Sequence, residues 1–141
     1  MITIAVVNSK GGVGKTTLTS ALAVRAAKDS PRVAMVDMDP QKSLVEWWKR
    51  RGKSDNPTIF EGAVTAGDAV EALTLDGWDY CFLDGPPAFL TLLQEMIETA
   101  DFTLIPVKAS MVDLLATQDA VSLARDAQAA FMCVFNDVGS R

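Results

Sequence analysis

A glycine-rich segment with two lysines and two threonines contains the residues of this sequence best suited to chemistry. It reads Ser-Lys-Gly-Gly-Val-Gly-Lys-Thr-Thr over residues 9–17 and follows an apolar run at residues 2–7. Glycines between a strand and a helix let backbone N–H groups surround a phosphate chain, and the helix N-terminus adds partial positive charge there. Lys15 would reach the terminal phosphates, and the Thr16 hydroxyl would hold Mg²⁺. The segment therefore predicts a nucleoside-triphosphate site.

The start of this segment departs from the general phosphate-loop pattern G-x-x-x-x-G-K-[ST], because Ser9 replaces the first glycine and Lys10 follows it. The form K-G-G-V-G-K-T-T resembles the deviant Walker A motif of the ParA/MinD family of P-loop ATPases, in which the early lysine is distinctive. An ordinary glycine-rich turn is the alternative. The resemblance implies ATP as the ligand, bound by Lys10, Gly11, Gly12, Val13, Gly14, Lys15, Thr16 and Thr17.

A carboxylate at the end of a later apolar run is the expected metal partner of this loop. Asp84 follows residues 78–83 as a Walker B carboxylate does, and it would bind Mg²⁺ near the Thr16 hydroxyl. The alternative is an aspartate that caps the next turn. Gly85-Pro86-Pro87 resembles the second switch of the family. The metal ligands implied are thus Thr16 and Asp84.

Two more segments resemble parts of the family's site. Asp37-Met38-Asp39-Pro40-Gln41 resembles the first switch, in which Asp39 would orient the attacking water, although turn formation before Pro40 is an alternative. Asn136 matches the asparagine at which family members read the adenine edge. The catalytic residues that the resemblance implies are Lys10, Lys15 and Asp39.

Strands that alternate with helices must position these residues. The sequence predicts strands at residues 2–8, 32–37, 58–60, 78–84, 102–107 and 131–136, and helices at residues 15–28 (or from Gly14), 42–51, 65–75, after residue 87, and 110–129. This alternation predicts an α/β fold with a mostly parallel, twisted sheet and helices on both faces, the three-layer arrangement of a P-loop NTPase. The candidate residues all fall at carboxyl ends of strands, where such sheets bind ligands.

Apolar spacing and capping patterns refine the helices. Capping spacing predicts helix starts at Thr65 and Ser110. A helix that continues to about residue 129 leaves almost no connection before the strand at Phe131, which is shorter than usual. Apolar residues recur at helical spacing at Leu18, Ala21, Leu22 and Ala26, and the helix after residue 87 is expected to bury Phe89, Leu93, Met96 or Ile97, and Ala100.

Composition narrows the function classes. The chain has 141 residues, which predicts a single P-loop ATPase domain over residues 1–141. It contains no histidine, which excludes catalytic triads with histidine and metal sites with histidine ligands. Cys81 and Cys133 form no C-x-x-C motif, and this disfavours an iron–sulfur carrier. Both cysteines are predicted to be small buried residues in strands. We see no membrane segment or secretory signal and expect a cytoplasmic protein.

The resemblance implies a function. Asp-x-Asp-Pro-Gln followed by Ser43, Leu44 and Trp47 is more similar to the ParA branch, and no helix-turn-helix segment precedes the loop, as in short plasmid-partition ParA proteins. We therefore expect a Mg²⁺-dependent ATPase that forms a homodimer with ATP, with Lys10 reaching the partner's phosphates. Non-specific DNA and a centromere-binding partition protein are the expected partners in plasmid or chromosome partitioning.

Two alternatives stay open: a MinD-like membrane-positioning ATPase, and a nucleotide-dependent scaffold in secretion or polysaccharide assembly. The net charge of −5 is unusual for a DNA-binding protein. Lys49-Arg50-Arg51 beside Trp47 and Trp48 is either a DNA or partner patch or a set of cations favoured at a helix C-terminus, with one tryptophan in the core. Family members continue beyond Arg141, so the C-terminal helices of the family are expected to be absent from this sequence.

Overall fold

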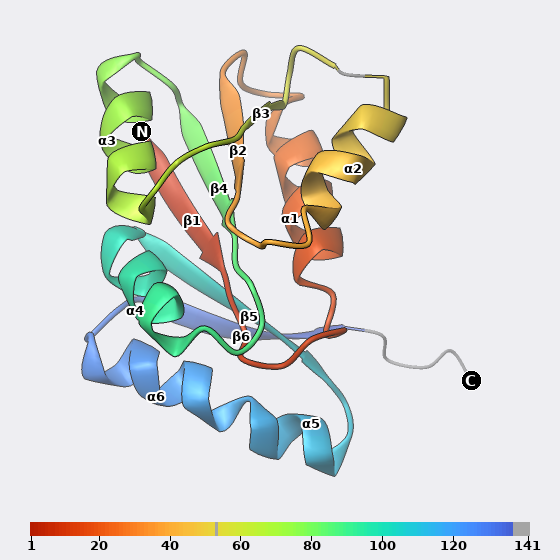
Figure 1. Ribbon diagram of the computed structural model, residues 1–141, viewed down its shortest axis with the longest axis vertical. Helices are drawn as coiled ribbons and strands as arrows, with labels where there is room; N and C mark the ends of the chain where they lie inside the picture. The colour runs from red at the N-terminus through yellow and green to blue at the C-terminus, as the bar shows by residue number, and fades with distance from the viewer. Residues whose placement is uncertain (53, 137–141) are drawn as a thin grey trace.

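Parallel strands in the order β3-β2-β4-β1-β5-β6 form one sheet in the computed structural model, which describes residues 1–52 and 54–136 (Figure 1). Every strand pair is parallel, which agrees with the helix that separates most consecutive strands. The strands are β1 (Ile2–Val6), β2 (Val33–Asp37), β3 (Thr58–Phe60), β4 (Tyr80–Asp84), β5 (Phe102–Lys108) and β6 (Phe131–Asn136). The predicted fold class is confirmed.

Helices cover both faces of this sheet. Helices α3, α4 and α6 pack on one face around the larger apolar core, and α1 and α2 pack on the other around a smaller core (Figure 1). The predicted capping boxes form, because Thr65 Oγ1 accepts from the Asp68 N–H (3.0 Å) and Ser110 Oγ accepts from the Asp113 N–H (3.1 Å). The helices are α1 (Lys15–Ala26), α2 (Ser43–Arg50), α3 (Ala66–Leu75), α4 (Leu90–Thr99), α5 (Met111–Ala116) and α6 (Gln118–Asp126).

The central strands bring the candidate site together. In the β1–β4 pair Val6 lies opposite Asp84, and in the β2–β4 pair Asp37 also lies opposite Asp84. Three neighbouring strands therefore end at the same level, where the loop after β1 begins. Their interiors are apolar on both sides, as a sheet covered on two faces requires.

The first turn of α1 presents polar groups to the interior. The helix buries Lys15, Thr19, Ser20 and Ala23, because it lies over the end of β4, where its first turn meets Asp84. From the apolar pattern, Leu22 and Ala26 pack half-buried against the smaller core, whereas Ala21 is exposed. Apolar spacing therefore indicated the helix and part of its packed face, but not its buried polar residues.

Helix α4 begins later than the apolar pattern indicated. Leu93, Met96 and Ile97 are buried as expected, but Phe89 is the N-cap residue and 57% of it is exposed. The chain before it contains two prolines and Ala88 at φ 60°, which direct Phe89 away from the core.

The predicted helix at residues 110–129 consists of α5 and α6, which meet at Thr117. Thr117 keeps helical backbone angles, and its hydroxyl donates to the carbonyl of Asp113 (2.8 Å). Helix α6 ends at Asp126, and Gln128 at φ 53° ends the turn, a conformation usually provided by glycine. Residues 127–130 therefore form an ordinary connection before β6, and the expectation of almost no connection was wrong.

The two cysteines differ in exposure. Cys81 on β4 is fully buried, and burial raises the pKa of its thiol to about 12. Cys133 is exposed, contrary to expectation, because β6 is the edge strand of the described sheet and carries other exposed residues such as Met132 and Phe135.

The aromatic and basic end of α2 packs against the smaller core. Trp47 and Trp48 are both half-buried there, and the Trp48 indole N–H donates to the carbonyls of Ser54 (3.1 Å) and Pro57 (3.0 Å). The Arg51 guanidinium lies 5.6 Å from the centre of the Trp47 ring. Both tryptophans thus have structural contacts, while Arg50 and Arg51 remain exposed.

Candidate functional site

The loop after β1 has a conformation that only glycine adopts readily at two positions. Gly12 has φ 73° and Gly14 has φ 94°. At Gly14 an added Cβ would also lie 1.9 Å from Nδ2 of Asn136, so a side chain has no space there. Asn136 itself donates to the Val13 carbonyl (3.1 Å), which places the end of β6 against this loop.

A cavity of about 280 Å³ lies at the loop and the start of α1. The structure brings the loop residues together there with residues from the ends of β2 and β4. The lining residues are Gly11, Gly12, Gly14, Lys15, Thr16, Thr17, Asp39, Gln41, Ser43 and Pro87. Asp84 lies behind Thr16, whereas Lys10 and Asn136 do not line this cavity.

Lys15 is held close to the loop. Its ammonium donates to the carbonyl of Lys10 (2.8 Å), and only 6% of the residue is exposed. Burial lowers the pKa of Lys15, and the negative charges of Asp84 and Asp39 oppose that effect. The result is a cation at the floor of the cavity, bonded to a backbone carbonyl that a phosphate oxygen could replace.

Thr16 and Asp84 form a pair of oxygen ligands. The Thr16 hydroxyl donates to Asp84 Oδ2 (2.7 Å), and the Thr19 hydroxyl lies 3.3 Å from Asp84 Oδ1. Burial raises the pKa of Asp84 to about 7, although both hydroxyl contacts and Lys15 lower it.

This donor set fits Mg²⁺. A hydroxyl and a buried carboxylate whose charge lacks full compensation are what a hard dication prefers, with phosphate oxygens and waters completing its shell. Within the described residues no cluster of three or more carboxylate or thiol side chains is available to hold a metal. Such a cluster is not required for a metal that binds together with a nucleotide.

The two aspartates after β2 have different environments. Asp37 is buried, and its carboxylate accepts from the backbone N–H groups of Asp39 (3.0 Å) and Val45 (3.1 Å), so it organises the turn into α2. Burial raises the pKa of Asp37. Asp39 instead lines the cavity, half-exposed, and accepts from the Gln41 N–H (2.9 Å). Of the two, Asp39 is the carboxylate that lines the cavity.

Lys10 points toward α5 instead of the cavity. Its ammonium forms an ion pair with Asp113, whose carboxylate also accepts from the Ser110 hydroxyl. These two contacts lower the pKa of Asp113. The Lys10 backbone N–H donates to Asn8 Oδ1 (3.0 Å), which fixes the start of the loop. In this structure Lys10 is thus bound within its own subunit.

Sequence reasoning missed several residues that shape the site. Asn8 is fully buried and donates to the carbonyl of Pro106 (2.9 Å) and to Thr117 Oγ1 (3.1 Å). Asp113 was read only as a helix cap, although it also pairs with Lys10. A polar residue at the end of an apolar strand was a signal available for Asn8; Asp113 carried no such signal, because its contact depends on the packing of α5.

The amino-acid sequence is similar to those of known proteins. Residues 4–141 match the model of the family described as the CobQ/CobB/MinD/ParA nucleotide-binding domain. The chain is 31% identical over 132 residues to the maintenance of carboxysome distribution protein A of Halothiobacillus neapolitanus, covering 89% of this chain and 59% of that protein. It is 30% identical over 135 residues to the chromosome-partitioning ATPase Soj of Thermus thermophilus, covering 75% and 54%.

A solved structure shares the fold. Cobyrinic acid a,c-diamide synthase from Mycobacterium smegmatis, with bound ATP analogue and magnesium, superimposes with a TM-score of 0.80 at 19% identity, covering 100% of this chain and 77% of that one. The chain spans between 51% and 59% of the length of three curated relatives that it matches, including the two named above. Within the described residues, none of the helices has the length and apolar character needed to cross a bilayer.

Proposed function

The chain belongs to the CobQ/CobB/MinD/ParA family of nucleotide-binding domains, and from that premise we propose that it is a ParA-type ATPase. It binds ATP with Mg²⁺, hydrolyses it slowly, and forms a homodimer in the ATP-bound state. The observation that supports this most strongly is the Thr16–Asp84 pair (2.7 Å) beside Lys15 at the mouth of the glycine loop. A phosphate cradle and a metal ligand pair occur there together.

The residues in and beside the cavity have the following proposed roles. The backbone N–H groups from Gly11 to Thr17 surround the phosphates, and the Lys15 ammonium exchanges the Lys10 carbonyl for a phosphate oxygen. Thr16 and Asp84 hold Mg²⁺, which supplies positive charge to the phosphate oxygens. Asp39 orients the attacking water through its free carboxylate edge. Asn136 reads the adenine edge from its position beside Val13.

The surface around Lys10 suits a dimer. Apolar residues are unusually exposed where α4 and α5 begin, at the carboxyl ends of the two strands next to β1. A second subunit that covers them would bury this apolar surface and bring its phosphates to Lys10. The exposed residues are Phe89 (57%), Leu90 (44%), Met111 (72%), Val112 (69%) and Leu115 (57%).

The cellular task we propose is partitioning of a plasmid or chromosome in the cytoplasm, with a centromere-binding protein as partner. The similarity to Soj supports this reading, and the similarity to a carboxysome distribution protein supports positioning of a large cargo in general. We propose that the protein binds DNA without sequence specificity for this task. With a net charge of −5, this chain would need a local basic surface for it, and the end of α2 offers Arg50 and Arg51.

ATP turnover, measured with and without DNA, tests the proposal. We expect slow Mg²⁺-dependent turnover that Lys15→Ala and Thr16→Ala abolish and that Thr16→Ser preserves, because serine keeps the metal-binding hydroxyl. We also expect DNA binding that requires ATP and weakens steeply with salt. Normal turnover in Lys15→Ala and Thr16→Ala would contradict the site. ATP-dependent binding to anionic vesicles instead of DNA would favour the MinD-like alternative, and nucleotide binding without turnover would favour a scaffold.

A further inference from the structure

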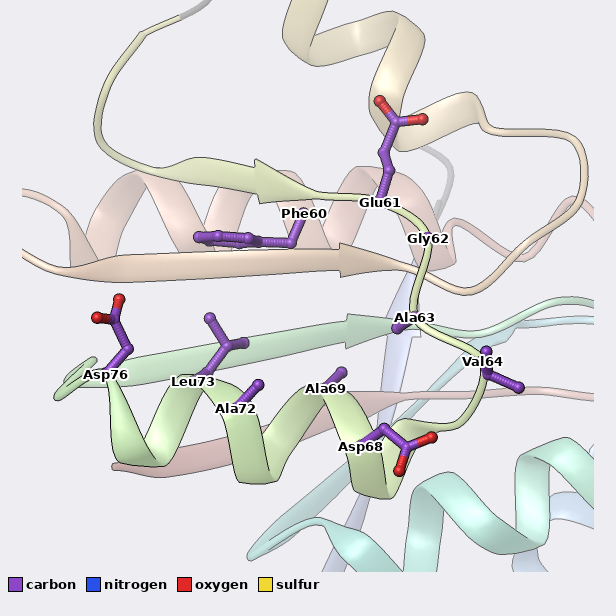
Figure 2. Close-up of a pocket in the computed structure, with 10 residues that line it drawn as sticks. All are labelled: Phe60, Glu61, Gly62, Ala63, Val64, Asp68, Ala69, Ala72, Leu73 and Asp76. Atoms are coloured by element: carbon purple, nitrogen blue, oxygen red, sulfur yellow. The ribbon is translucent and has the colours of Figure 1, made fainter.

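A second cavity, of about 500 Å³, lies away from the glycine loop and shares no residue with the phosphate cavity. It runs along α3, between that helix and the segment that leaves β3, as Figure 2 shows. Its floor is apolar and consists of Phe60, Ala69, Ala72 and Leu73. We refer to it as the α3 groove.

The groove is open because its neighbours are short and small. Strand β3 has only three residues and lies at the edge of the sheet, so it covers little of α3. Ala69 and Ala72 leave space where larger residues would fill it, and the Phe60 ring turns to pack edge-on against Trp78 (5.0 Å between ring centres). Val64, at one end of the groove, is 87% exposed.

A carboxylate lies at each end of the groove, and one of the two already has a cation as its partner. Figure 2 shows Asp68 at one end of α3 and Asp76 at the other, with the apolar side chains between them. Within the described residues Asp68 has no ion-pair partner, whereas Asp76 is shared with Arg32 (2.9 Å) and the Trp78 indole (2.8 Å). The C-terminal carbonyls of α3 add partial negative charge at the Asp76 end.

The spacing of these charges matches an extended peptide. Asp76, the C-cap residue of α3, lies eight positions after Asp68, which corresponds to about 12 Å at about 1.5 Å per residue. In an extended chain, residues i, i+2 and i+4 share one face, and i to i+4 spans about 13 Å at about 3.3 Å per residue. A cation at i would therefore meet Asp68, a cation at i+4 would replace Arg32 at Asp76, and an apolar side chain at i+2 would enter the middle.

We propose that the α3 groove binds an extended segment of a partner protein in which two basic residues flank an apolar residue at alternate positions. The carboxylates select the cations, and the apolar floor takes the central side chain. The same negative rim disfavours a nucleotide or a nucleic acid, whose phosphates it would repel. We expect binding that is independent of ATP, because the groove and the phosphate cavity share no lining residue.

Fluorescence anisotropy of a labelled peptide tests the groove. The probe is a short Ser/Gly peptide that carries Lys-x-Leu-x-Lys, and the control peptide carries Glu-x-Leu-x-Glu. We expect saturable binding of the lysine peptide alone. Asp68→Asn should weaken it about two- to fivefold, as loss of an exposed charge pair does. Ala72→Arg, which fills the groove and adds repulsion, should weaken it at least about tenfold.

Matched controls lie on the same helix outside the groove. Glu71→Gln removes one carboxylate and Leu75→Arg adds one cation, and neither position lines the cavity. Both should bind the probe as the unmodified protein does, and all variants should keep their melting temperature and MgATP turnover. The peptide is tested without nucleotide, so failure of the ATPase assignment leaves this result interpretable.

Four outcomes would overturn the proposal. Equal binding of the two peptides would show that the carboxylates do not select the peptide by charge. Equal loss of affinity in Leu75→Arg and Ala72→Arg would show that the peptide does not bind in the groove. Absence of binding at millimolar peptide would exclude a docking site of this kind. Self-association of the protein that Ala72→Arg abolishes, without peptide binding, would identify a second copy as the occupant.

Discussion

At the scale of single residues, the side chains proposed to meet ATP are all bonded to protein groups. Lys15 donates a hydrogen bond to a backbone carbonyl, Thr16 donates one to Asp84, and Lys10 forms an ion pair with Asp113. Each of these partners is replaceable by a phosphate oxygen or a metal ion of matching charge. Nucleotide binding therefore exchanges contacts instead of filling an empty set of donors, and the strength of each existing contact influences affinity.

The Lys10–Asp113 ion pair is expected to oppose dimerisation, because Lys10 must leave Asp113 to reach a partner's phosphates. Asp113→Asn should therefore lower the ATP concentration that gives half-maximal dimer by about two- to fivefold, the range for a partly exposed ion pair. Sedimentation velocity over an ATP titration measures this, with Asp126→Asn, exposed on α6, as the control. A higher requirement for ATP in Asp113→Asn would show that Asp113 supports the dimer instead.

Asp84 should make the stability of the metal-free protein depend on pH. Its pKa is about 7 when folded, against about 3.9 for an unfolded aspartate, so the folded protein binds the additional proton between these values. The free energy of unfolding should then fall as pH rises through about 7. Asp84→Asn should flatten this slope, and the raised pKa of Asp37 should leave a smaller one of the same sign.

Urea midpoints at about pH 5 and about pH 8, in the presence of a chelator, measure the slope. Asp126→Asn again provides the control for loss of one exposed carboxylate. A metal-free protein that is more stable at the higher pH would contradict the assigned environment of Asp84.

At the scale of elements, the sequence predicted the order and type of the strands and helices, because parallel strands are continuous apolar runs and the capping boxes at Thr65 and Ser110 are local. It failed where a residue acts against its usual preference. Gln128 ends α6 in a conformation typical of glycine, and Ala88 precedes α4 at positive φ. The buried polar residues of α1 were not indicated by apolar spacing, because their partner Asp84 is distant in sequence.

The part of the site formed by short sequence motifs could be predicted from the sequence. The residues from Gly11 to Thr17 and the strand-end aspartates could be recognised from motifs. The structure brings most of the loop and Asp39 to one cavity, with Asp84 behind Thr16. The partner of Lys10 and the role of Asn8 depend on how α5 packs against β5 beside the loop, which no local pattern encodes.

Gly14 in the glycine loop and Gly52 after α2 have nearly the same φ and can be compared. Gly14 has φ 94° and Gly52 has φ 93°, but an added Cβ would meet Asn136 at Gly14, whereas at Gly52 it would meet no atom of the described residues within 4 Å. Gly52→Ala should cost about 1–2 kcal/mol of stability from backbone strain alone. Gly14→Ala should cost at least about 1 kcal/mol more, because the contact with Asn136 must be displaced.

Urea denaturation of both variants measures the difference. Adding Asn136→Ala to Gly14→Ala should recover the extra cost but leave the backbone strain. Equal destabilisation by Gly14→Ala and Gly52→Ala would show that Asn136 does not pack against the loop.

At the scale of the whole molecule, the sheet gathers every candidate group at one edge, and two surfaces of different character flank it. The exposed apolar residues at the starts of α4 and α5 lie beside Lys10, whereas the α3 groove shares no residue with the phosphate cavity. A dimer at the first surface would leave the second one accessible. Subunit association and partner recognition would then be separable functions.

Mixing two inactive variants tests the proposed two-fold arrangement. In a mixed dimer of Lys10→Ala and Asp39→Ala subunits, one site keeps its own Asp39 and receives Lys10 from the other subunit. Random pairing makes half of the dimers mixed, with one complete site each, so about a quarter of wild-type turnover should return. If mixed dimers form, as affinity tags on one variant can establish, and turnover stays absent, Lys10 does not act across the interface.

The position of β1 in the sheet has a consequence for synthesis of the protein. Its neighbours are β4 and β5, which begin at Tyr80 and Phe102, so β1 leaves the ribosome long before either strand exists. An apolar strand without a partner is the kind of segment that chaperones protect, and pairing over such sequence distances is slow. The glycine loop is translated early, but its contact with Asn136 forms only after β6 has emerged. The nascent chain would therefore gain its phosphate site late, after most of the sheet has been translated.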